Sequence, residues 1–223
     1  MPKLTCPLCQ HSDIQFYHED KRRQFHQCQR CDLVFVDGRS LPSAEREKQE
    51  YDLHENNAED EGYRRFLQRA MAPVTATVTP PAKGLDFGCG PAPVLAGMLS
   101  ESGYHMSVYD PFYADDSTAL EISGYYDFIT CTEAIEHFHT PHREISLLTR
   151  LLAANGVLVI MTKRVESALK FASWHYKNDL THVSFFSDQT FAFIGNHYGY
   201  DITLYSKDVV LLKKHSQIPG IIR

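Results

Sequence analysis

Residues 84–90, Gly84-Leu85-Asp86-Phe87-Gly88-Cys89-Gly90, decide the fold of this chain. The segment starts as a short buried strand and breaks into glycines just before a helix-compatible run from Val94 to Ser102. Glycine is needed at such a turn because the backbone bends sharply and a ligand must approach closer than a Cβ would permit. The stretch therefore predicts a strand, a tight turn and a helix.

A second apolar strand, His105 to Tyr109, ends in Asp110. A carboxylate can accept hydrogen bonds from both hydroxyls of a ribose, and an acid about 20 residues beyond the first glycine is where a Rossmann-like site places it. Glycines alone can serve packing, so Asp110 is what favours a cofactor that contains adenosine. Pro93 replaces the third glycine of the dinucleotide fingerprint, which argues against a nicotinamide dehydrogenase.

Leu85-Asp86-Phe87-Gly88-Cys89-Gly90 resembles the first motif of class I S-adenosylmethionine-dependent methyltransferases, in which the acid lies near the methionine end of the cofactor. This resemblance implies an α/β fold, a Rossmann-like sheet with helices on both faces, and S-adenosyl-L-methionine as cofactor. The cofactor-binding residues that we expect are Asp86, Gly88, Cys89, Gly90, Asp110, Pro111, Thr132 and Glu133.

The chain departs from the usual layout after Asp110, because only about sixteen residues precede the next strand, Asp127 to Thr132. We expect a shortened or missing third strand, with Asp115 or Asp116 as candidates to hold the adenine amine. The remaining elements that we predict are a helix over 141–153, a turn at Asn155-Gly156, a strand over 157–161, a helix over 186–198 ended by Gly199, and an antiparallel strand pair over 201–205 and 209–213.

Thr132-Glu133-Ala134-Ile135-Glu136-His137 follows the fourth strand, at the edge where open α/β sheets bind ligands. On a helix, Glu133, Glu136 and His137 would share one face, where they could bind a divalent ion such as Mg²⁺, position a hydroxyl or act as a base. Alternatively, the two acids cap and solvate a helix start. The stretch resembles the E-x-x-E-H motif of ubiquinone-biosynthesis O-methyltransferases, which extends the resemblance over roughly 82–214 and implies that these residues lie beside the transferring methyl group.

Residues 174–186 are dense in aromatic and ionisable side chains, a composition that suits a flat or hydroxylated substrate. We expect Trp174, Tyr176, Asp179 and His182 to contact the substrate. His182 is a candidate base with Glu136 and His137, or is a packed histidine hydrogen-bonded to Asp179. Cys89 and Cys131 are interpreted as small residues that face the cofactor rather than as nucleophiles.

Cys6, Cys9, Cys28 and Cys31 form two C-x₂-C pairs joined by a stretch that suits a β-hairpin. Such pairs present thiolates to one tetrahedral Zn²⁺, and closed four-cysteine coordination indicates a structural metal. Disulfides are disfavoured in a chain without a secretion signal. Lys21-Arg22-Arg23 is interpreted as a solvated hairpin tip, with a nucleic-acid contact as the alternative.

Three segments follow from these patterns: a zinc-ribbon-like module over 1–40, a helical linker and cofactor cover over 41–80, and the cofactor-binding domain over 81–223. Helically spaced apolar residues mark the linker, and His54, Asn56 and Tyr63 are candidates to reach the active site or to be ordinary surface residues.

The net charge of −6 and pI near 6.0 give no global field for phosphate backbones. No apolar run is long enough to span a bilayer and no signal peptide is recognised, so we expect a cytoplasmic protein. The favoured function is O-methylation of a small hydroxylated or aromatic molecule. An RNA or protein methyltransferase that docks through the zinc module, and a non-catalytic binding protein with a degenerate cofactor site, are the alternatives. The oligomeric state stays open.

Overall fold

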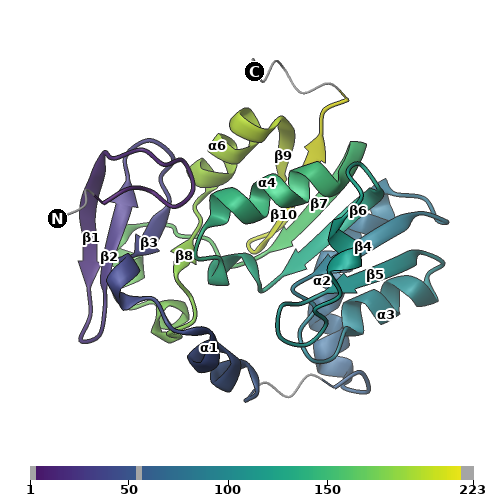
Figure 1. Cartoon of the computed structure of the whole chain (residues 1–223), viewed down its shortest axis with the longest axis horizontal. Coiled ribbons are helices and arrows are strands. Elements are labelled where there is room, and N and C mark those ends of the chain that lie inside the picture. The colour runs from purple at the N-terminus through teal and green to yellow at the C-terminus, as the bar shows by residue number, and fades with distance from the viewer. Residues whose placement is uncertain (1–3, 54–56, 217–223) are drawn as a thin grey trace.

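The computed structural model describes residues 4–53 and 57–216, which contain two β-sheets and their covering helices (Figure 1). The larger sheet has six strands in the order β5-β4-β6-β7-β10-β9. Strands β4, β5, β6 and β7 are parallel, whereas β10 and β9 form an antiparallel pair at one edge. Their bounds are β4 Lys83–Phe87, β5 His105–Tyr109, β6 Tyr126–Thr132, β7 Leu152–Met161, β9 Tyr200–Leu204 and β10 Val209–Lys214. This arrangement confirms the Rossmann-like α/β prediction.

Helices cover both faces of the large sheet (Figure 1). On one face, α2 (Glu61–Thr77) and α3 (Val94–Glu101) pack against Val157, Val159 and Met161 of β7. On the other face, α4 (Pro141–Leu151) and α6 (Asp188–Tyr198) pack against Leu158 and Ile160 of the same strand. Successive side chains of a strand point to opposite faces, so the continuous apolar run of β7 serves both cores.

The third strand of the usual layout, predicted to be shortened or missing, is missing from the described part of the chain. Between β5 and β6 there is only a short 3₁₀ helix, η2 (Ser117–Leu120). In the sheet, β4 lies between β5 and β6. The chain passes from β4 to β5 on one side of it and then crosses to β6 on the other side, so the strand order reverses at β4. Open α/β sheets bind ligands at such a switch point, beyond the carboxyl ends of the strands.

Two predicted boundaries were wrong. The turn at Asn155-Gly156 lies inside β7, where the register with β6 shifts and Asn155 takes the left-handed conformation with φ of 62°. The last helix starts at Asp188 rather than at residue 186, because Ser187 caps it in a capping box with Thr190. Gly199 ends that helix with φ of 78°, as predicted.

The smaller sheet has the order β1-β2-β3-β8. Its first strands are β1 (Ile14–Glu19), β2 (Gln24–Cys28) and β3 (Val34–Val36), and its last strand is β8 (Ser184–Phe185) from the other end of the sequence. The chain then passes through η1 (Gly38–Ser40) and α1 (Ala44–Tyr51) toward α2, while η3 (Ile135–His137), α5 (Ala168–Ala172) and η4 (His175–Asn178) are short helices in the connections.

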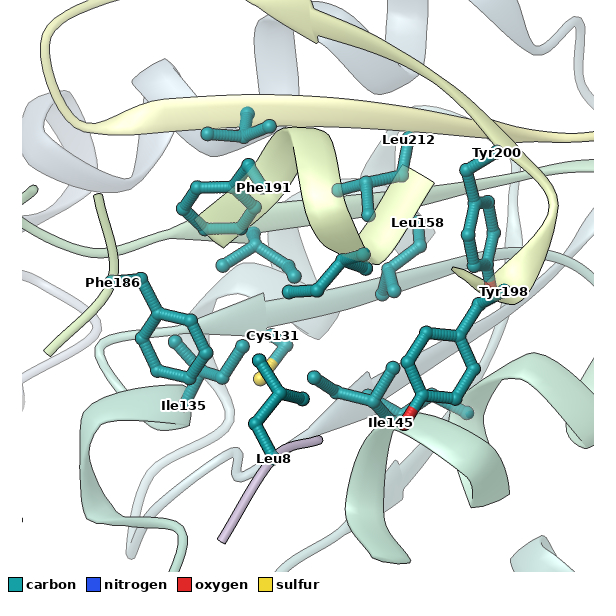
Figure 2. Close-up of a cluster of buried hydrophobic side chains, with 14 of the residues drawn as sticks. Leu8, Cys131, Ile135, Ile145, Leu158, Phe186, Phe191, Tyr198, Tyr200 and Leu212 are labelled. Atoms are coloured by element: carbon teal, nitrogen blue, oxygen red, sulfur yellow. The ribbon is translucent and has the colours of Figure 1, made fainter. Parts of the chain in front are cut away.

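The two sheets share one hydrophobic core. Figure 2 shows Leu8, from the turn between Cys6 and Cys9, in the same buried cluster as Cys131, Ile135 and Ile145. Leu8 and Cys131 are fully buried. Cys131 was therefore wrongly expected to face the cofactor, since its side chain points into the core. Among the helices within residues 4–53 and 57–216, none is long and apolar enough to cross a membrane.

Candidate active site

The glycine turn after β4 takes the conformation that the sequence predicted. Gly88 and Gly90 have φ of 78° and 65°, in the left-handed region that favours glycine. A Cβ on Gly88 would lie 2.6 Å from the Cβ of Ala134. The backbone N–H of Gly88 donates to the carbonyl of Tyr109 at 2.8 Å, which ties the turn to the end of β5.

Asp110 organises the end of β5. Its Oδ2 accepts a hydrogen bond from the N–H of Gly90 at 3.0 Å, and its Oδ1 accepts from the N–H groups of Phe112 and Tyr113 at 2.9 and 3.1 Å. Each carboxylate oxygen has two lone pairs, so acceptor capacity remains for a ligand hydroxyl. Asp115 and Asp116 are exposed, Asp116 caps η2 through Thr118, and neither residue lines the cavity described below.

Asp86 is buried at the end of β4, with only 4% of its surface exposed. The hydroxyl of Thr130 donates to its Oδ1 at 2.7 Å. Burial raises the pKa of Asp86 to about 6, because desolvation penalises the carboxylate more than the Thr130 hydrogen bond favours it, and the charge of Asp110 acts in the same direction as burial.

A cavity of about 740 Å³ opens above the switch point of the sheet. All eight residues expected to bind the cofactor line it: Asp86, Gly88, Cys89, Gly90, Asp110, Pro111, Thr132 and Glu133. Tyr63, Phe66 and Leu67 of α2 line it as well, so Tyr63 reaches the site as proposed from the sequence. His54 and Asn56 lie outside the described residues.

The segment after β6 does not form the helix on which Glu133, Glu136 and His137 would share one face. Glu133 has φ of 46°, and only Ile135–His137 form a single 3₁₀ turn, η3. This turn sends Glu136 inward, where it is fully buried, accepts a hydrogen bond from the hydroxyl of Tyr176 and leaves its Oε2 without a partner within the described structure. Burial raises the pKa of Glu136, and burial together with the nearby Glu136 charge raises the pKa of Glu133 to about 8.

His182 faces Glu136 from the loop that precedes β8. Its Nδ1 lies 2.7 Å from the carbonyl oxygen of Tyr176, and its Nε2 lies 3.8 Å from Oδ2 of Asp179. Its ring lies 4.8 Å from that of His137 between centroids, and the Nδ1 of His137 lies 3.1 Å from the carbonyl oxygen of Thr181. Burial lowers the pKa of His182, which favours the neutral imidazole.

The expected divalent site has a different composition. Glu136, His137 and His182 offer ligand atoms within 4.8 Å of one another, and Glu133 does not belong to this group. Two of the three donors are imidazoles, whereas Mg²⁺ prefers oxygen ligands in octahedral geometry. The donor set does not fit magnesium.

A family described as a methyltransferase domain matches residues 59–205, more than half of the chain. The chain belongs to this family. It is an S-adenosylmethionine-dependent methyltransferase, as the resemblance of residues 85–90 implied. No curated protein sequence matches the chain at a significant level.

Solved structures of low identity share the fold of this methyltransferase. One is a methyltransferase from Archaeoglobus fulgidus, 18% identical, with a TM-score of 0.53 over 67% of this chain and 94% of the other. Another is the 1,6-didemethyltoxoflavin-N1-methyltransferase of Burkholderia thailandensis, with bound 1,6-didemethyltoxoflavin and S-adenosylhomocysteine; it is 14% identical, with a TM-score of 0.52 over 90% of this chain and 99% of the other.

The substrate residues expected in the methyltransferase divide into two groups. Asp179 and His182 line the cavity. Trp174 and Tyr176 do not; Trp174 packs against Phe171, and Tyr176 is buried behind Glu136 and supports it through its hydroxyl. The reason is that η4 turns these two aromatic rings toward the smaller sheet, so they complete a core instead of a binding surface.

Sequence reasoning missed one wall of the cavity. Glu47 and Tyr51 of α1 line it, with Phe112, Phe138, His139, Glu144 and Leu147. His139 Nε2 lies 2.8 Å from Oε1 of Glu47, and the Tyr51 ring lies 5.1 Å from that of His137. The only sequence indication of this wall was that α1 lies within residues 41–80, the predicted cofactor cover. The sequence of an amphipathic helix does not show which part of the protein its apolar face contacts.

The cysteine pairs of the methyltransferase meet as predicted. Sγ atoms of Cys6 and Cys31, and of Cys9 and Cys28, are 3.4 Å apart, and all four sulfurs lie within 4.8 Å of one another. Tetrahedral Zn²⁺ with bonds of about 2.3 Å requires sulfurs about 3.8 Å apart, so these thiols fit one zinc ion.

The basic cluster Lys21-Arg22-Arg23 lies within the cysteine module, and only part of it is solvated. Arg23 is 4% exposed and its guanidinium donates to backbone carbonyl oxygens of residues 177–182. Arg22 remains exposed and donates to the carbonyl of Asn178 at 3.0 Å. A buried guanidinium cannot contact a phosphate backbone, so one of the three basic residues of this cluster is not available for a nucleic-acid contact.

Proposed function

We propose that this methyltransferase transfers the methyl group of S-adenosyl-L-methionine to an oxygen of a small hydroxylated or aromatic molecule. One observation carries the proposal: the same cavity is lined by Asp110, by Asp86 and by His182. Its volume of about 740 Å³ lies in the upper part of the range for ligand pockets and gives room for the cofactor and a small acceptor. The structure from Burkholderia thailandensis contains bound 1,6-didemethyltoxoflavin together with S-adenosylhomocysteine.

Each end of the cofactor has a proposed set of partners. Asp110 would accept a hydrogen bond from a ribose hydroxyl through the remaining lone pair of its Oδ2, and the turn at Gly88 and Gly90 would let the cofactor approach the backbone. Asp86 and Glu133 lie toward the methionine portion, where their carboxyl groups face an ammonium and a sulfonium. Cys89, Pro111 and Thr132 complete this wall through their contacts with the cavity.

The charged residues that line the cavity limit which methyl acceptors can bind there. Among the described residues that line the cavity there is no lysine or arginine. Its acidic members are Glu47, Asp86, Asp110, Glu133, Glu136, Glu144 and Asp179. This lining suits a sulfonium cofactor and repels anions, so the portion of the acceptor inside the cavity carries no phosphate or carboxylate. Tyr51, Phe112 and Phe138 offer aromatic surfaces for a flat ring.

The chemistry requires alignment, exclusion of water and removal of one proton, because the cofactor supplies the activated methyl group. We propose His182 as the base. A carbonyl oxygen can only accept, so the contact with Tyr176 places the ring proton on Nδ1 and leaves Nε2 to take the proton of the acceptor hydroxyl. Glu136 and His137 adjoin the ring of His182, where Glu136 favours the imidazolium that forms.

We further propose that Cys6, Cys9, Cys28 and Cys31 hold one structural zinc ion, because their sulfurs cluster as a tetrahedral site requires. The division into a zinc module over 1–40, a cover over 41–80 and a catalytic domain over 81–223 remains part of this proposal. The ubiquinone-biosynthesis resemblance supports an oxygen acceptor without naming one.

The test is calorimetry of S-adenosylhomocysteine binding to the zinc-loaded protein, followed by a screen of phenols, catechols and amines with radiolabelled S-adenosylmethionine. We expect binding by the parent and transfer to a neutral hydroxyl compound. Transfer to an amine or a carbon centre would overturn the oxygen acceptor, and transfer to RNA or protein would restore the docking alternative.

A further inference from the structure

Arg23 joins the cysteine module to the loop that carries His182. It directly precedes β2 and its side chain is 4% exposed. Its guanidinium donates to the carbonyl oxygens of Asp179 at 2.9 Å, Leu180 at 3.0 Å and His182 at 2.9 Å, and also to that of Lys177. A planar guanidinium offers five N–H donors in a fixed fork, and four carbonyls of one loop converge on it here.

The same loop forms part of the cavity on its other side. The side chains of Asp179 and His182 line the cavity, whereas their carbonyl oxygens face Arg23, which does not line it. The loop also contacts η3, because the N–H of Val183 donates to the carbonyl of Glu136 at 2.9 Å and the carbonyl of Thr181 lies 3.1 Å from Nδ1 of His137. The loop is thus held between Arg23 and η3.

The cysteine cluster fixes the elements that hold the loop. β2 begins next to Arg23 and ends at Cys28. β3 follows Cys31 closely and pairs with β8 through Val34 and Phe185, and the N–H of Val36 donates to the carbonyl of Val183 at 2.9 Å. Arg23 lies within the segment that the four cysteines close, and β3, which pairs with β8, begins three residues after Cys31.

We infer that Arg23 is a positioning residue for methyl transfer, which sets the 177–182 loop so that His182 and Asp179 face the acceptor. The cysteine module is then a structural part of the active site and not a separate docking module. This inference rests on the proposed function in one respect, since it takes His182 as the residue that serves the acceptor. Lysine could not replace Arg23, because a single ammonium cannot bond four separated carbonyls at once.

The experiment compares Arg23→Gln and Arg23→Lys with the parent in the full-length, zinc-loaded chain. Amide hydrogen exchange over residues 177–183 reports the loop, and the imidazole NMR signal of His182, identified by its loss in His182→Gln, reports the position of that side chain. Arg22→Gln is the matched control, because Arg22 is the neighbouring residue but donates to only one loop carbonyl from an exposed position. Zinc content and S-adenosylhomocysteine affinity are measured in every variant.

We expect both Arg23 variants to exchange the loop amides at least about tenfold faster than the parent and to shift and broaden the His182 signal, with zinc content and cofactor affinity retained. Arg22→Gln should change neither reporter by a comparable amount. Parent-like exchange and an unmoved His182 signal in both Arg23 variants would overturn the inference. So would loss of zinc or of cofactor binding in Arg23→Lys, because Arg23 would then support folding in general. If the proposed function were wrong, the parent protein itself would not bind S-adenosylhomocysteine. The amide exchange of the loop and the His182 signal would still test the role of Arg23 in that case.

Discussion

The Oδ2 of Asp110 accepts a hydrogen bond from the backbone N–H of Gly90 at 3.0 Å, which joins the end of β5 to the glycine turn after β4. Asp110→Ala removes this link and the proposed ribose partner together. We expect S-adenosylhomocysteine binding to fall below detection in calorimetry.

The matched control for this change is Asp116→Ala. Asp116 also accepts from a backbone N–H two residues ahead, that of Thr118 at 3.0 Å, but it does not line the cavity. The Asp116→Ala variant should bind S-adenosylhomocysteine with the affinity of the parent. If Asp110→Ala and Asp116→Ala lost S-adenosylhomocysteine affinity equally, the loss would come from the disturbed backbone after β5 and not from a ribose contact of Asp110.

Asp86→Asn should stabilise the fold while it weakens cofactor binding. Burial raises the pKa of Asp86 to about 6 from 3.8, so the carboxylate destabilises the folded state above pH 6 and this cost vanishes below pH 4. Asparagine keeps an acceptor for Thr130 and removes the charge. Two pKa units correspond to about 3 kcal/mol, the upper bound expected for the gain at pH 8.

Urea unfolding of the parent and Asp86→Asn at pH 4.5 and pH 8 measures this difference, where the gain should be small at the lower pH and largest at the higher. A gain that is the same at both pH values would show that the charge of Asp86 is not its source.

His182→Gln should lower kcat by about 10²–10⁴-fold while S-adenosylhomocysteine affinity stays unchanged, because it removes the proposed base and leaves the cofactor wall intact. The groups that face this ring are Glu136, His137, Asp179 and Tyr176. Burial lowers the pKa of His182 below the ordinary 6.5, so the base stays neutral at mildly acidic pH. The acid limb of kcat/KM should therefore lie below the usual histidine range.

His105→Gln is the control for this prediction, since His105 is exposed on β5 and lies outside the cavity. A rate profile of His182→Gln that retains the acid limb and the turnover of the parent would assign the proton transfer to another group.

The zinc-loaded protein should contain one zinc per chain by elemental analysis, and Cys28→Ser should lose it, because three thiolates leave the tetrahedral site open. Cys89→Ser should keep the zinc, since Cys89 lies at the cavity and not in the cluster. A second metal equivalent that survives Cys28→Ser but is lost in His182→Gln would place an ion at Glu136, His137 and His182.

Local patterns in the sequence predicted the sheet, the glycine turn and the cysteine cluster. Each depends on residues close in sequence: Gly88 and Gly90 need a conformation that only glycine adopts readily, and a C-x₂-C turn places two thiols together without help from the rest of the chain. The eight residues predicted to bind the cofactor all line the cavity for the same reason, because they lie at or directly after the ends of β4, β5 and β6.

The acceptor side of the site depended on contacts between distant segments. Glu133 and Glu136 follow a helical spacing, yet the left-handed conformation of Glu133 and the buried bond from Tyr176 to Glu136 gave one 3₁₀ turn, since tertiary packing outweighs local propensity. Arg23 looked like a surface charge in a basic cluster, but its partners lie more than 150 residues away in the chain.

The sequence by itself thus determined the fold class, the cavity wall at the ends of β4, β5 and β6, and the cluster of four cysteines, because short-range backbone geometry and residue spacing specify them. Only the tertiary structure decided that Trp174 and Tyr176 complete a core, that α1 forms a wall of the cavity, and that Arg23 supports the His182 loop. These roles depend on contacts between segments that are far apart in the sequence. Every residue has a backbone carbonyl, so the sequence does not indicate which carbonyls will accept a hydrogen bond from Arg23 in the folded protein.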